Sequence, residues 1–157
     1  MFTTLQGLLR ELAHGSAPTG GFVLNPGDAG LLAGLDGLTA SDASLSSQGG
    51  ATIAAHVAHL SYGLSLMNRW AAGEDPFASA DWTAAWQIGA VSDDEWAALR
   101  AELRSQLDAW HSAIATRREL LPVELHGVIG SVVHLGYHLG AIRQIHARLR
   151  GPKDGQA

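Results

Sequence analysis

Hydrophobic residues recur at steps of three and four in three long stretches of the chain. The first stretch runs from Thr52 to about Ala72, and its apolar positions are Ile53, Val57, Leu60, Leu64 and Met67. The second begins at the capping box Ser92–Glu95 and runs to about Glu119, with Trp96, Leu99, Leu103, Leu107, Trp110 and Ile114. The third runs from about Pro122 to Arg150, with Val128, Val132, Leu135, Leu139 and Ile142. Because this spacing keeps apolar side chains on one helical face, each stretch predicts a long amphipathic helix.

Two shorter helices are predicted before these. Phe2–His14 places Leu5, Leu8, Leu9 and Leu12 on one side, and the Gly- and Pro-rich segment Gly15–Gly21 ends it as a loop. A second short helix is expected to begin at Asn25-Pro26, with Asn as the N-cap and Pro at the first helical position. It carries Leu31, Leu32, Leu35 and Leu38 and is expected to end before the Ser- and Gly-rich stretch Ser41–Gly50.

These elements predict an all-α protein, since no strand pattern and no internal repeat is evident. We expect a four-helix bundle made of the three long helices and the helix around Leu31–Leu38, with Phe2–His14 as an additional short N-terminal helix. The connection Phe77–Ala90 is long enough to cross the end of the bundle and can contain a short helix around Trp82 and Trp86. The length of 157 residues predicts a single domain, 1–157, with a core from about residue 28 to 150.

Composition narrows the classes of function. With 46% hydrophobic and 16% charged residues the chain is typical of a globular protein, and the absence of cysteine excludes disulfides, thiolate metal ligands and a cysteine nucleophile. A net charge of −5 argues against nucleic acid as a partner. The N-terminal residues have no signal-peptide pattern, which predicts a cytoplasmic protein. Leu125–Ile142 lacks acidic and basic residues but holds three histidines and four glycines, which favours a buried bundle helix over a membrane span.

Candidate chemistry centres on His134 and His138. In a helix, residues four apart lie on the same face, so their two imidazoles can bind one divalent ion. A third ligand has to come from another helix, and the first long helix offers His56 and His59. His56 lies nearer the centre of the apolar stripe and suits a site in the middle of the bundle. His59 lies nearer the edge and suits a site that is open at the bundle's mouth.

The segments TIAAHVAHL (52–60) and HLGYHLGAIRQ (134–144) resemble the DinB/YfiT-like superfamily of four-helix-bundle metalloproteins. The family pattern has an apolar start after Thr or Ser, a His-Leu seven residues later, and His-x-x-x-His-x-Gly near the C-terminus. Matched to it, His59 takes the first ligand position, and His134 and His138 take the second and third. The resemblance covers about Asp28 to Leu149. It implies a divalent metal, zinc or nickel, on these three histidines, with His56 outside the ligand set.

The same resemblance implies a metal-dependent enzyme that acts on a small molecule. Family members include transferases and isomerases that use low-molecular-weight thiols, and others are described as hydrolases. Because this chain has no cysteine, a thiol would have to enter as a cosubstrate. Two alternatives stay open at this point: a non-catalytic, stress-related metal-binding bundle protein, and a scaffold without metal.

No catalytic acid or base is identified by spacing. Glu74, Asp75 and Asp81 follow the helix of His59 and could reach the site, but a solvated loop is the preferred interpretation. Arg143 is interpreted as an exposed helix residue, with an anion anchor as the alternative. Trp82 and Trp86 are expected to form a lid or to pack in the core, with the lining of a pocket as the alternative.

A homodimer is predicted from one face of the last helix. Gly136 and Gly140 form a small-residue pair four positions apart, with Val133 and Tyr137 beside them. Glycine within a helix costs roughly 1 kcal/mol relative to alanine, so these positions suggest a close helix approach, within the bundle or across a dimer.

Overall fold

The all-α prediction is confirmed. The computed structural model describes residues 2–116 and 121–149, and this part of the chain contains helices and no β-strand. The helices are α1 (Phe2–His14), α2 (Gly30–Asp36), α3 (Ala40–Ala43), α4 (Ile53–Ala71), α5 (Asp93–Thr116) and α6 (Pro122–Ile145). Three 3₁₀ turns complete them: η1 (Phe77–Ser79), η2 (Ala84–Gln87) and η3 (Ala147–Leu149).

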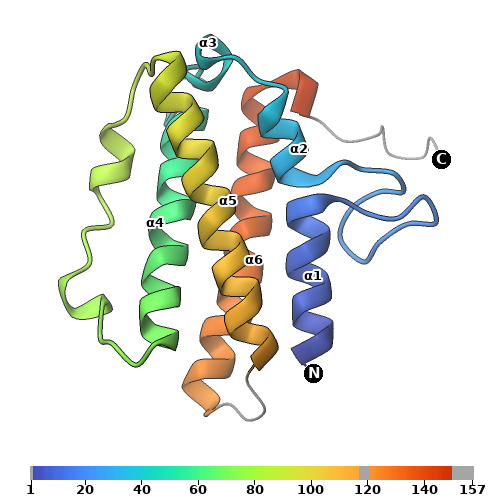
Figure 1. Cartoon of the computed structure of the whole chain (residues 1–157). Coiled ribbons are helices and arrows are strands. Elements are labelled where there is room, and N and C mark those ends of the chain that lie inside the picture. Colours follow the sequence, from blue (N-terminus) through green and yellow to red (C-terminus); the bar gives the residue numbers. More distant parts are fainter. Residues whose placement is uncertain (1, 117–120, 150–157) are drawn as a thin grey trace.

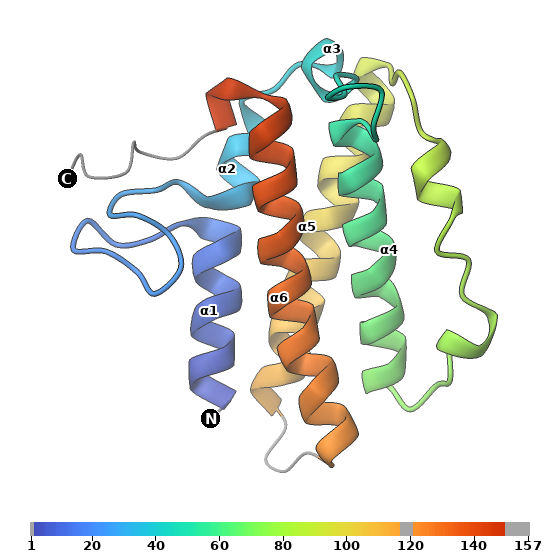
Figure 2. The same cartoon turned by 180° about the vertical axis from the view of Figure 1, so that it is seen from behind.

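Four helices lie side by side and enclose the core. α4 packs against α5 and α6, and α1 packs against the same two helices, so that α1 and α4 are separated by the other pair (Figures 1 and 2). The core is formed by fully buried residues of all four helices, among them Leu9, Leu12, Ile53, Leu60, Leu103, Ile114, Leu135 and Ile142. The predicted role of Phe2–His14 as an addition is therefore corrected. Leu9 and Leu12 are as deeply buried as the core leucines of the long helices. The seven-residue α2, which adds Leu31 and Leu35 to the same core, stacks against the end of α1.

The long helices begin where the sequence predicts. The Thr52 side chain accepts a hydrogen bond from the Ala55 N–H at the start of α4, and Ser92 and Glu95 form the reciprocal capping bonds of α5. Pro122 is the first residue of α6. The end of α6 differs from the prediction, because His146 adopts an extended conformation and the chain turns into η3. Glu119 and Arg150, the predicted ends of two helices, lie outside the described residues.

The predicted start of the second helix is wrong. Asn25–Asp28 forms a turn in which the Asp28 N–H donates to the Asn25 carbonyl at 3.1 Å, and α2 begins only at Gly30. Gly30 has a φ of +74°, and a Cβ on it would lie 2.3 Å from the backbone nitrogen of Gly15. This close crossing of two loop segments needs glycine and prevents an earlier helix start. The helix also ends before Leu38, and part of the predicted loop after it is α3, which Thr39 and Asp42 cap.

A buried carboxylate anchors the loop between α1 and α2. Glu11 accepts hydrogen bonds from the backbone N–H groups of Phe22, Val23 and Leu24 at 2.7 to 3.0 Å. Burial acts to raise the pKa of Glu11, but these three N–H donors outweigh it and the net shift is downward. The loop is thus held against α1 by charge-assisted hydrogen bonds.

The connection between α4 and α5 runs along the outer side of α4 (Figures 1 and 2). The Thr52 hydroxyl donates to the Ile88 carbonyl at 2.9 Å, and the Asp81 N–H donates to the Tyr62 hydroxyl at 2.8 Å. These two bonds hold the connection against α4, one next to Trp82 and the other two residues after Trp86.

No helix in the described part of the chain, α6 included, is both long and apolar enough to cross a membrane.

Candidate metal centre

Three histidines meet where α4 packs against α6. The Nε2 of His134 lies 3.1 Å from the Nε2 of His59 and 2.9 Å from the Nε2 of His138. One nitrogen from each ring falls within 4.8 Å of the other two. His59 and His138 are buried and His134 is half-buried. The helical spacing brings His134 and His138 together, and the packing of α4 against α6 adds His59, so the structure groups the three histidines that the sequence pattern predicts.

His56 lies beside this cluster and contacts His138 on the side of its ring opposite His134. Its Nδ1 is 2.9 Å from the Nδ1 of His138, the ring nitrogen that faces away from His134. The edge of its ring also meets Trp86, with centroids 5.4 Å apart. His56 is therefore placed to hold the ring of His138 in position, which is the usual task of a hydrogen-bonding partner to a metal ligand.

The nitrogens of the cluster are not satisfied by hydrogen bonding among themselves. A neutral imidazole carries one N–H and one lone pair, so the single Nε2 of His134 cannot make two good hydrogen bonds to two other Nε2 atoms. The Nδ1 of His59 is buried and has no hydrogen-bond partner among the described residues. A cation shared by the three Nε2 lone pairs would replace the close contacts among the Nε2 atoms, and the Nδ1 of His59 would then carry the hydrogen of its ring.

The separations also suit a metal ion. A tetrahedral zinc lies roughly 2.0–2.1 Å from each nitrogen, which places the nitrogens about 3.3–3.4 Å apart. The two contacts at 2.9 and 3.1 Å are a few tenths of an ångström shorter. The ligand nitrogens of His59 and His138 lie within 4.8 Å of each other. Small side-chain rotations would bring all three separations to the zinc value, so the residues present fit a divalent ion.

Burial keeps these imidazoles in the form that binds metal. Desolvation lowers the pKa of all four histidines. The pKa of His138 falls to about 3 and that of His59 to about 4, first because of burial and then because neighbouring histidines would repel a second positive charge. A neutral imidazole is the ligand form, so metal binding at neutral pH needs no deprotonation here.

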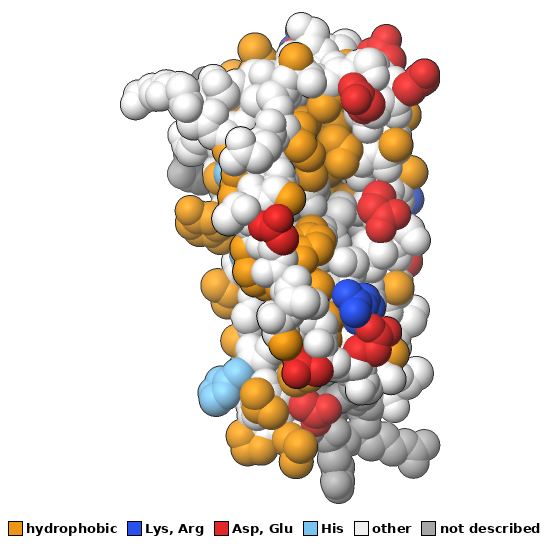
Figure 3. All heavy atoms as spheres, turned by 90° about the vertical axis from the view of Figure 1, so that its left-hand side faces the viewer, with side chains coloured by type: hydrophobic (Ala, Val, Ile, Leu, Met, Phe, Trp, Pro, Cys, Tyr) orange, Lys and Arg blue, Asp and Glu red, His pale blue; other side chains and the backbone are white. Residues whose placement is uncertain are grey.

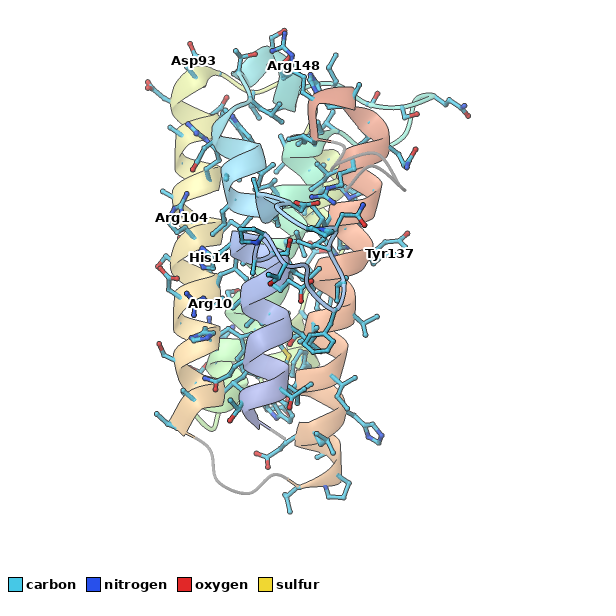
Figure 4. All side chains as sticks on the ribbon, turned by 90° about the vertical axis from the view of Figure 1, so that its right-hand side faces the viewer. Arg10, His14, Asp93, Arg104, Tyr137 and Arg148 are labelled. Carbon is cyan, nitrogen blue, oxygen red and sulfur yellow. The ribbon has the colours of Figure 1, made fainter. Side chains whose placement is uncertain are left out.

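These shifts predict how the stability of the metal-free protein depends on pH. Below the ordinary histidine pKa of 6.5 the unfolded chain takes up protons on His59 and His138, while the folded chain does so only near their lowered values of about 4 and 3. The free energy of unfolding should therefore fall as pH drops from 6.5 toward 4. Urea unfolding in the presence of a chelator, at pH 7 and pH 5, measures this. A double variant with glutamine at both positions should lose the part of the dependence that His59 and His138 contribute, whereas His14→Gln, at an exposed position of α1 (Figure 4), should keep it.

Two tryptophans cover the histidines from the connection between α4 and α5. The indole of Trp86 stacks on the imidazole of His59, with centroids 4.3 Å apart and planes 27° from parallel. Trp82 approaches the same ring at 5.8 Å. Both indoles remain 37% to 41% exposed, so they form an outer wall rather than part of the core. The expectation that they pack in the core is therefore wrong, and Trp82 lines a cavity beside His59.

A cavity of about 460 Å³ adjoins the cluster. His59 and His134 belong to its lining, together with Leu60, Gly63, Leu64, Met67, Phe77, Trp82, Gly127, Gly130, Ser131 and Leu135. Figure 3 shows the face on which the connection lies, where hydrophobic side chains gather between scattered acidic ones. The histidine pattern alone does not reveal this cavity. The only signal in the sequence is glycine at positions 63, 127 and 130 within helices, where it is costly.

The carboxylates that follow α4 are used for local structure. The Oδ1 of Asp81 accepts hydrogen bonds from the N–H and the hydroxyl of Thr83, and Glu74 forms an ion pair with Arg69 at 2.7 Å. Asp75 is exposed. The preferred interpretation of these residues as loop residues agrees with these contacts.

Arg143 is not the exposed residue that the sequence suggested. Its Nη2 lies 2.7 Å from the Oδ1 of Asp28, and the two side chains are 17% and 3% exposed. The guanidinium is therefore used to join α6 to the turn before α2. The remaining histidines lie apart from the cluster, and His146 contacts Asp42 at 3.2 Å.

The proposed dimer face is only partly free. Val133 and Tyr137 are 64% and 70% exposed, and Tyr137 projects outward from α6 (Figure 4). Gly136, however, faces Leu12 of α1, where an added Cβ would lie 3.7 Å from the leucine side chain. That glycine thus serves the packing of α6 against α1, and the homodimer stays a prediction.

Compared with models of known protein families, with curated proteins and with solved structures, the chain matches none of them.

Proposed function

We propose that the protein binds a divalent metal ion, zinc or nickel, through His59, His134 and His138, and that it is a metal-dependent enzyme acting on a small molecule. The observation that carries this proposal is the convergence of three histidine nitrogens within 4.8 Å beside a cavity of about 460 Å³. The four helices that lie side by side agree with a relationship to the DinB/YfiT-like metalloproteins, which we include in the proposal.

The number and kind of ligands favour a catalytic site over a purely structural one. Structural zinc sites usually close the ion with four protein ligands, whereas three leave a position for substrate. His59 and His134 line the cavity, so that position can be reached from it. A bound divalent ion supplies Lewis-acid chemistry, polarising a substrate oxygen or lowering the pKa of a coordinated group.

The surrounding residues have supporting tasks. His56 orients the ring of His138 through the 2.9 Å contact between their Nδ1 atoms. Trp82 and Trp86 reduce the access of bulk water to His59. The reaction class that fits is hydrolysis, or transfer to a low-molecular-weight thiol that enters as a cosubstrate. Because Asp81 and Glu74 are engaged elsewhere, a non-catalytic metal-binding protein is the alternative.

Metal analysis of the purified protein tests the proposal. We expect about one zinc or nickel ion per chain by inductively coupled plasma mass spectrometry, loss of that ion to a strong chelator, and rebinding of one equivalent. Cobalt(II) should give the visible absorption of a site with nitrogen ligands and low coordination number. Protein that neither retains nor rebinds a divalent ion at micromolar concentration would contradict the proposal. A panel of esters, amides and electrophiles, with and without added thiols, then separates an enzyme from a non-catalytic protein.

A further inference from the structure

We propose that the cavity beside the three histidines binds a predominantly apolar, uncharged molecule, whose one polar group points toward His59 and His134. Only the orientation of the polar group rests on the proposed function, because the proposed metal ion would bind that group. The class of ligand follows from the walls of the cavity.

The walls offer apolar surface almost everywhere. They are formed by Leu60, Leu64, Met67, Phe77, Trp82 and Leu135, with backbone exposed at three glycines, and no charged side chain belongs to the lining found among the described residues. An ionised group placed there would lose its hydration without a partner, which is strongly unfavourable. The cavity therefore selects against charged ligands.

The lining contains three polar side chains, Ser131, His59 and His134. Ser131 donates its hydroxyl hydrogen to the Val128 carbonyl at 2.7 Å and accepts from the indole N–H of Trp110 at 2.8 Å, so its hydroxyl is already engaged. This leaves His59 and His134 as the polar groups that a ligand can address. A bound molecule is thus oriented with its polar end at the histidines and its apolar part toward Met67 and Phe77.

Glycines keep the space open next to the histidines. A Cβ added at Gly63 would lie 3.6 Å from both Trp82 and the ring of His134, so any larger side chain there would enter the gap between them. Gly130 has no neighbour within 4 Å of an added Cβ, although it belongs to the lining. A leucine at position 130 can therefore reduce the cavity without a backbone clash.

The volume sets the size of the ligand. At roughly 30 Å³ per non-hydrogen atom, the share of one water in the liquid, about 460 Å³ accommodates on the order of 10 to 15 such atoms. A two- or three-ring aromatic or a chain of six to eight carbons with a polar head is of this size.

The first experiment tests the cavity without metal. 1-Aminoanthracene, an uncharged fluorescent aromatic of suitable size, is titrated into chelator-treated protein and competed with 1-octanol. We expect saturable binding that weakens at least tenfold in Gly130→Leu and stays unchanged in Gly140→Leu. Gly140 is an exposed position of the same helix with equally open surroundings, so it is a matched control.

Met67→Gln, which changes the polarity of the cavity wall at similar side-chain size, gives a second variant if Gly130→Leu does not fold. It should weaken binding severalfold.

The second experiment tests the orientation with metal. Alkyl hydroxamic acids of four to eight carbons are titrated into the zinc- or cobalt-loaded protein. Each added methylene should raise the affinity about fourfold until the cavity is filled. A terminal carboxylate on the longest chain should remove this gain.

The outcomes separate the two proposals. If a metal binds but 1-aminoanthracene does not, or binds equally in all variants, the cavity inference is overturned while the metal site stands. Hydroxamate affinity independent of chain length overturns it as well. If the aromatic binds as expected and no metal is retained, the proposed function fails and the apolar cavity remains.

Discussion

Alanine at His59, His134 or His138 should all but abolish retention of a divalent ion, whereas alanine at His56 should weaken binding only ~10–100-fold. The reason is geometric. Each of the first three contributes a nitrogen to the group within 4.8 Å, while His56 contacts the opposite nitrogen of His138. Three ligands already leave the coordination shell incomplete, so the loss of one leaves too few to hold the ion.

Metal content after dialysis and competition with a chromophoric chelator measure this difference. His111→Ala and His126→Ala, which remove histidines outside the cluster, are the matched controls and should retain metal like the unmodified protein. Metal retained in His59→Ala and lost in His56→Ala would reverse the assignment of the third ligand. If no single histidine substitution lowers the metal content, the assignment of the three-histidine site is wrong.

Breaking the ion pair between Asp28 and Arg143 should lower the free energy of unfolding by about 3 kcal/mol. The pair is buried, with side chains 3% and 17% exposed, so removal of one partner leaves a charge without compensation in a poorly hydrated place. Asp28 also accepts a hydrogen bond from the Gly30 N–H at 2.8 Å, which helps the chain enter α2. Asp28→Asn and Arg143→Met are the informative changes, and urea unfolding at pH 7 is the measurement.

The chain provides its own control for this effect. Arg69 and Glu74 form an ion pair of the same length, 2.7 Å, but both side chains are 51% exposed. Arg69→Met and Glu74→Gln should therefore change stability by no more than about 1 kcal/mol. Similar small effects for both pairs would show that the pair of Asp28 and Arg143 is hydrated.

Local patterns were sufficient to predict the long helices and the spacing of two candidate metal ligands on one of them. The apolar periodicity marks α4, α5 and α6, and the four-residue step places His134 and His138 on one face, because both depend only on helix geometry. The choice between His56 and His59 is different. It depends on how α4 is rotated about its axis against α6. In the sequence, only the position of His59 at the edge of the apolar stripe and the family resemblance indicate that rotation.

Features that arise from tertiary contacts cannot be predicted from local sequence patterns. The helix expected at Asn25-Pro26 has good capping residues, yet the crossing of Gly15 and Gly30 delays its start. Arg143 pairs with a residue 115 positions away, so no local pattern could reveal its burial. The core role of α1 was missed for a related reason: a thirteen-residue helix has too few apolar positions to show which neighbours it will meet.

The contact between His59 and His134 joins two points 75 residues apart in a chain that has no cysteine. An ion held by both would act as a removable cross-link. Because the ion would bind the folded chain and not the unfolded one, it would stabilise the folded state by RT ln(1 + c/Kd), about 4 kcal/mol at a free-ion concentration c of ~1,000 Kd. The two histidines belong to the fourth and sixth helices, so the cross-link can form only after α6 has docked on α4. Metal loading would then be the last step of folding, and metal removal would lower the stability of a fold in which α6 is still held by α1 and by the Arg143–Asp28 pair.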